Sequence, residues 1–171
     1  MKRILFFYSL ALLFILPDLY AGKINKDQRE VEEKKVTHTV TKFFRACQRQ
    51  KFKEAYQLTT GREREIYYNI LKRIKKRNGS VPAEVKKYFS RLKKFYVDIV
   101  VVDDLGNRAI AHCIFQFKFY DSKSRDEIRK FREVHYYLEK VDGEWKITFS
   151  KLKSERYNYK SKSNPKRNRR Y

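Results

Sequence analysis

The chain has 171 residues, of which 42 are Lys or Arg and 20 are Asp or Glu, and its formal net charge at pH 7 is +22. This length fits one domain with a sizeable core. Heat adaptation alone does not explain the charge, because thermophile proteins typically enrich Lys and Glu together. Such an excess of positive charge attracts polyanions.

The N-terminus has the pattern of an export signal. Met1–Arg3 carries positive charge, an apolar run covers 13 residues from Ile4 to Leu16, and Pro17 breaks it before Ala21-Gly22. A helix that spans a bilayer needs about 20 apolar residues. We therefore expect residues 1–21 to be a cleaved signal peptide and the mature chain to be periplasmic or extracellular. A buried helix or an uncleaved anchor would be the alternatives.

Two cysteines, Cys47 and Cys113, are present. In an oxidising compartment they could form one disulfide. Otherwise they would be small buried hydrophobic residues, as free cysteines often are. Their spacing matches no metal motif.

Four helices are predicted in the first half of the mature chain, over residues 26–49, 52–58 and 62–77 and from Pro82 onward. The first has a narrow apolar stripe. Its members are Val36, Val40, Phe43, Phe44 and Cys47.

The last two predicted helices are strongly basic. Residues 62–94 hold 12 Lys or Arg against 3 Glu, a local charge of +9. One such helix would be read as a solvated face, but two neighbours with the same bias could form a continuous basic surface. The candidate binding residues in this region are Lys72, Arg73, Lys75, Lys76, Arg77, Lys86, Lys87 and Arg91.

From Phe95 the apolar pattern changes to a period of two, which is typical of strands. Phe95, Val97, Ile99 and Val101 alternate, residues 103–107 form a turn, and residues 121–130 form a polar loop. The clearest strand face consists of Ala109, Ala111, Cys113, Phe115, Phe117 and Phe119. Two further strands follow, around Val134–Leu138 and Trp145–Phe149, with a turn at Asp142-Gly143.

These elements predict an α+β fold over residues 22–152, with N-terminal helices packed on a four-strand antiparallel sheet. Residues 153–171 carry 8 Lys or Arg against one Glu and no aliphatic core pattern, so we expect a disordered basic tail. Its candidate binding residues are Lys166, Arg167, Arg169 and Arg170.

The segment Val40–Thr60, which contains Phe52–Leu58, and the closing segment Val141–Ile147 carry a family resemblance. The chain from Asp27 to Leu152 resembles the cystatin-like α+β superfamily of nuclear transport factor 2, ketosteroid isomerase and limonene epoxide hydrolase. Within it, the chain is most similar to exported bacterial members with a single such domain. The resemblance implies that the sheet is curved and cone-like and that the helices close a conical pocket against it, but fold alone does not assign chemistry.

No Gly-rich phosphate loop, Ser-centred elbow or paired-His metal motif occurs in the sequence. His112 and His135 lie on polar strand faces and are interpreted as surface residues. Asp98 lies between Val97 and Ile99. It could be a general base in an apolar pocket, or it could point outward and pair with Lys or Arg.

Two classes of function follow from these observations. The first is an exported, noncatalytic binding or scaffold protein of the bacterial cell envelope, whose basic surface meets an anionic polymer, a membrane surface, an acidic protein or nucleic acid. The second is a small-molecule-binding protein or acid–base enzyme with an enclosed pocket. We expect no cofactor and no metal in either case.

Overall fold

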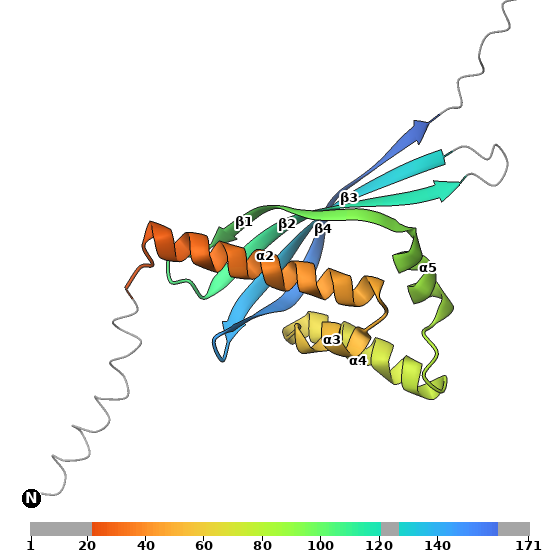
Figure 1. Ribbon diagram of the computed structural model, residues 1–171, viewed down its shortest axis with the longest axis horizontal. Helices are drawn as coiled ribbons and strands as arrows, with labels where there is room; N and C mark the ends of the chain where they lie inside the picture. Colours follow the sequence, from red (N-terminus) through yellow and green to blue (C-terminus); the bar gives the residue numbers. More distant parts are fainter. Residues whose placement is uncertain (1–21, 121–126, 161–171) are drawn as a thin grey trace, which may run out of the picture.

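The computed structural model describes residues 22–120 and 127–160. Helices come first along the chain and strands second (Figure 1). The helices are α2 (Lys26–Gln48), α3 (Phe52–Gln57), α4 (Gly61–Lys76) and α5 (Ala83–Arg91). None of the described helices combines the length and the apolar content that a membrane span requires.

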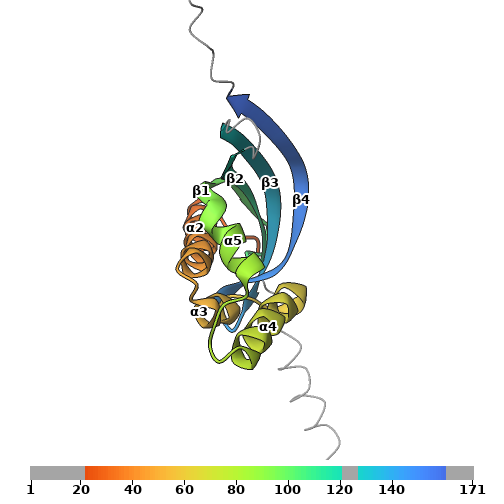
Figure 2. The ribbon, with the colours of Figure 1, turned by 90° about the vertical axis from the view of Figure 1, so that its right-hand side faces the viewer.

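The strands form one antiparallel sheet in the order β1-β2-β3-β4, so each strand pairs with its neighbour in the sequence. They are β1 (Leu92–Val102), β2 (Arg108–Tyr120), β3 (Glu127–Val141) and β4 (Glu144–Lys160). The sheet is curved, and the helices lie on one side of it (Figure 2). The α+β architecture expected from the sequence is confirmed.

Helix α2 is the main covering element of the sheet. It begins with a capping box, in which the side chains of Asn25 and Gln28 each accept a hydrogen bond from the other's backbone N–H. These bonds satisfy two of the four N–H groups that a helix start leaves open. The apolar stripe predicted for this helix is buried against the sheet.

The predicted face of β2 packs beneath α2 near Phe115, whereas Phe117 farther along the strand contacts Tyr88 of α5. The ring centroids of Phe44 on α2 and Phe115 on β2 lie 4.7 Å apart in an edge-to-face contact. Ala109 and Ala111 are buried in the same cluster, and residues this small leave room for the helix. Cys47 and Cys113 are both buried free thiols, so the alternative of small buried residues holds rather than the disulfide.

Strand β1 departs from the predicted alternation. A bulge between Val97 and Ile99 shifts the pairing with β2 by one residue. Because a shift of one residue turns every following side chain to the other face, Ile99 and Val101 are each 57 % exposed. Val102 supplies the buried contact instead. The prediction of one shared face was therefore wrong beyond Val97.

Two predicted boundaries were also wrong. Strand β3 begins at Glu127, inside the expected polar loop. Strand β4 continues to Lys160, so residues 153–160 are paired with β3 rather than part of a disordered tail. The signal-peptide residues 1–21 and the remaining tail residues, including Lys166, Arg167, Arg169 and Arg170, lie outside the described residues.

Candidate functional site

The basic residues predicted on the last two helices lie on one helix–loop–helix segment, formed by α4, the loop 77–82 and α5. The helices are joined by an ion pair between Arg73 and Glu84. A backbone hydrogen bond and this guanidinium hold the pKa of Glu84 below its usual range. The pair links the last turn of α4 to the first turn of α5.

Seven of the eight predicted basic side chains are exposed, and Arg91 is half-buried. Among the described residues, Arg73 is the one member of this set with a carboxylate partner. We call the set the basic hairpin. It consists of Lys72, Arg73, Lys75, Lys76, Arg77, Lys86, Lys87 and Arg91.

One of the three acidic residues in this region faces away from the basic hairpin. Glu63, in the first turn of α4, is 6 % exposed and accepts a hydrogen bond from the Ser150 hydroxyl on β4 at 3.2 Å. Burial raises the pKa of this carboxyl, although the Ser150 bond and Arg62 oppose the shift. The exposed surface of the hairpin is consequently more basic than its sequence suggests.

Beyond the helices, three strands continue as an extension that we call the β-arm (residues 117–120, 127–130 and 157–160). Pairing between β1 and β2 starts at Leu92 and Phe117, so this extension contains only β2, β3 and β4. Figure 1 shows these strands running past the helical layer. The β-arm therefore has an inner face that α2 does not cover.

At the base of the β-arm, aromatic and basic side chains line a small hollow of about 140 Å³. We call it the aromatic hollow, and its residues are Tyr88, Phe117, Phe119, Lys130 and Arg132. Tyr88 comes from α5 and packs on Phe117 with ring centroids 5.0 Å apart. The Arg132 guanidinium lies 6.0 Å from the centre of the Tyr88 ring.

Two cations in the aromatic hollow share one carboxylate. Lys130 Nζ and Arg132 Nε each lie 2.5 Å from an oxygen of Glu155. Hydrogen bonds from Lys130, Tyr157 and Arg132 lower the pKa of this carboxyl to about 2. The cluster keeps one positive charge in excess.

A second hollow, of about 430 Å³, adjoins the first at Phe119. It is lined by Arg91, Lys93 and Lys118, and Arg91 lies over the Phe119 ring at 4.7 Å. Since Arg91 also belongs to the basic hairpin, the hairpin and the aromatic hollow are continuous.

Sequence reasoning missed the aromatic hollow. Lys130 lay at the end of the predicted polar loop, because Lys130 and Arg132 occupy inward positions of β3 at the base of the β-arm, where apolar residues would have marked a strand. Cations on an inward face hide the alternation that marks a strand. The sequence feature that could have indicated the hollow is the run of aromatic residues on β2, which continues to Phe119 beyond the part that α2 could cover.

The other chemical candidates lie elsewhere. Asp98 is the extra residue of the β1 bulge and points outward, where its carboxylate lies 3.2 Å from His112 Nδ1. Its partner is thus His112 rather than Lys or Arg. The space between α2 and the sheet is filled by rings, such as Phe44 and Tyr136 with centroids 5.2 Å apart. Cys47 and Tyr67 form a buried contact of 3.1 Å in the same region.

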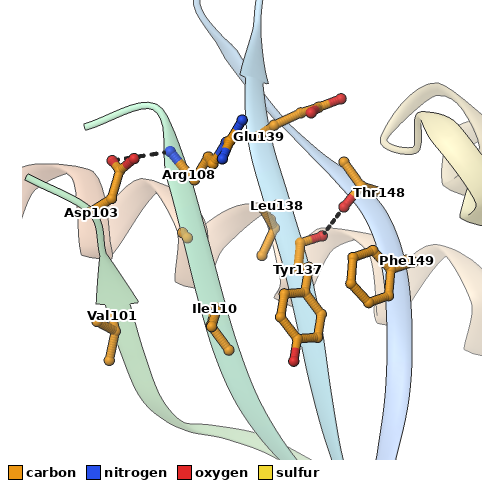
Figure 3. Close-up of a pocket in the computed structure, with 10 residues that line it drawn as sticks. Val101, Asp103, Arg108, Ile110, Tyr137, Leu138, Glu139, Thr148 and Phe149 are labelled. Carbon is orange, nitrogen blue, oxygen red and sulfur yellow. Dashed lines mark hydrogen bonds between the residues drawn. The ribbon is translucent and has the colours of Figure 1, made fainter. Parts of the chain in front are cut away.

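The outer face of the sheet carries an apolar row that crosses all four strands. Val101 pairs with Ile110, Ile110 with Tyr137, and Tyr137 with Phe149, whose ring stacks on Tyr137 at 4.1 Å. Together with neighbouring polar residues, these side chains line an open hollow of about 510 Å³ (Figure 3). No helix covers this face in the described part of the chain (Figure 2).

No family model matches this chain, and the search of curated proteins found no match. Among solved structures, the intermembrane space region of the chloroplast protein ARC6 is similar, with a TM-score of 0.43 and 14 % sequence identity. The match covers 70 % of this chain and 95 % of that chain.

Proposed function

We propose that this protein is an exported, noncatalytic binding or scaffold module of the cell envelope, which meets an anionic partner through the basic hairpin. The observation that carries the proposal is the exposure of these cations together with the scarcity of carboxylates beside them in the described residues. Cations that lack neighbouring carboxylates keep their full attraction for an external polyanion.

The alternative of an enzyme with an enclosed pocket receives less support. Asp98, the candidate base, lies on the side of the sheet opposite the helices. The position of the conical pocket implied by the family resemblance is occupied by packed rings. We propose membership of the cystatin-like superfamily on the order of helices and strands and on the curved meander, and we infer no catalytic activity from it.

The proposal predicts that neutralising the hairpin weakens binding to polyanions. We would replace Lys72, Lys75, Lys76 and Arg77 by Gln and leave Arg73 to hold α5. Binding to duplex DNA and to anionic vesicles would be measured by fluorescence anisotropy and cosedimentation at low and physiological salt. Affinity should fall at least tenfold, and for DNA the slope of log affinity against log salt should decrease by about 0.9 for each lost phosphate contact.

A matched control removes the same charges elsewhere. Lys26, Lys42, Arg45 and Lys53 are exposed on α2 and α3, and the set again contains three Lys and one Arg. Their replacement by Gln should reduce binding far less. Equal losses in the two variants would mean that only the net charge matters, and the hairpin would no longer be the binding surface.

A further inference from the structure

We infer that the aromatic hollow and the adjoining basic hollow form a binding track for single-stranded nucleic acid. This inference rests on the proposed function and names the class of its anionic partner. The track joins the basic hairpin at Arg91, so one flexible strand could contact both.

Aromatic rings and cations alternate along the track. Phe117, Lys130 and Tyr157 stand side by side on three paired strands, and Lys130 Nζ lies 4.9 Å from the centre of the Tyr157 ring. Single-stranded nucleic acid offers the same alternation, because each nucleotide has a flat base and a charged phosphate. Proteins that bind single strands combine aromatic stacking surfaces with a positively charged groove in this way.

The charge of the two hollows favours an anionic ligand. Five cations line the two hollows: Arg91, Lys93, Lys118, Lys130 and Arg132. The carboxylates beside them are Glu155, shared by Lys130 and Arg132, and Glu127, which contacts Lys118 and Arg129. Arg91 and Lys93 have no carboxylate partner among the described residues. Among the residues that the structure describes, the site therefore retains positive charge after these pairs are formed.

The shape of the aromatic hollow disfavours a bilayer as the partner. Lys130 has only 14 % of its side chain exposed, because it is recessed between rings at the base of the β-arm. The hollow lies on the side of the sheet that also carries the helices, because Tyr88 of α5 lines it and packs on Phe117. A flat membrane surface would touch the rim of such a hollow, whereas a thin strand can enter it.

The test compares two tyrosines on opposite faces of the sheet. Tyr157 borders the aromatic hollow and is 48 % exposed, whereas Tyr96 lies on β1 and is 49 % exposed. Each would be replaced by Leu, and binding of a fluorescein-labelled oligothymidylate would be measured by anisotropy. Loss of a stacking ring should weaken binding of the oligonucleotide about tenfold for Tyr157→Leu. Tyr96→Leu should bind like the wild type.

Further measurements separate the possible results. Tyr88→Leu, which changes the hollow from the α5 side, should also weaken oligothymidylate binding, and circular dichroism would verify that each variant is folded. The wild type should prefer the single strand to a duplex of equal length. Equal binding by the Tyr157 and Tyr96 variants, or tighter retention on phosphatidylglycerol vesicles without dependence on Tyr157, would overturn the single-strand inference but leave the proposed function. A wild type that binds no polyanion would overturn both.

Discussion

At the residue scale, Glu63 is the most deeply buried carboxyl among the described residues. It lies in the first turn of α4, its hydrogen-bond partner is the neutral Ser150, and burial raises its pKa. Transfer of a carboxylate out of water costs free energy unless a cation and hydrogen bonds compensate for it. Glu63 therefore makes the stability of the domain depend on pH.

The sign of this dependence follows from proton linkage. The folded state binds the Glu63 proton more tightly than the unfolded state, so its contribution to the unfolding free energy falls as pH rises from the ordinary value of 4.5 through the folded pKa. The substitution Glu63→Gln removes this loss of unfolding free energy at higher pH. Measured by urea unfolding between about pH 4 and pH 8, the stability of the variant relative to the wild type should increase with pH, by about 1.4 kcal/mol for each unit of pKa difference.

The control for this prediction is Glu65→Gln, which changes an exposed carboxyl on the same helix. Its stability relative to the wild type should vary little over the same pH range. A Glu63→Gln variant whose relative stability does not change with pH would show that Glu63 has the same proton affinity in the folded and unfolded states.

At the scale of elements, the length of β4 determines how the β-arm can be studied. Residues 153–160 pair with β3, from the row of Glu133 and Ser154 to the row of Glu127 and Lys160. Glu155 and Tyr157, which contact the cations of the aromatic hollow, belong to this stretch. Removing all residues after Leu152 would therefore alter both the basic tail and the folded sheet.

Two truncations separate these effects. A chain that ends at Leu152 should have an unfolding free energy lower by on the order of 3 kcal/mol, because several ladder hydrogen bonds are lost at about 1 kcal/mol each. A chain that ends at Lys160 retains the whole of β4 and should unfold at the same urea concentration as the full-length protein. If the chain ending at Leu152 were equally stable, the pairing of residues 153–160 would contribute nothing to the fold.

At the scale of the whole molecule, the effect of the net charge depends on the compartment in which the protein is located. The net charge of +22 is distributed over a surface on which the basic hairpin and the hollows adjoin. Self-repulsion on this scale opposes compaction and self-association, and an anionic partner would relieve it. Which polyanions the protein meets depends on its compartment.

Export therefore has its own test. Residues 1–21 are predicted to be removed, so mass spectrometry of the protein from its native host should find a new N-terminus near Gly22. The expected mature chain has 150 residues and a net charge of +21. An intact Met1 on a soluble cytosolic protein would contradict this prediction.

The sequence determined the elements whose apolar residues are buried under another element. The stripe from Val36 to Cys47 and the alternation from Ala109 to Phe119 each have one period, since both faces pack into the same hydrophobic core. The basic hairpin was equally predictable, because exposed cations follow from composition and helical spacing alone.

Tertiary structure decided the rest. The β1 bulge turned Ile99 and Val101 away from the helices, and nothing in a run of alternating residues marks the point where such a shift occurs. Helix α2 does not cover the base of the β-arm, so the inward positions of β3 there need not be apolar, and Lys130 and Arg132 can occupy them. Hydrophobic periodicity indicates which residues are buried beneath another element. Where no element covers the sheet, only the pairing of distant strands shows which residues are in contact.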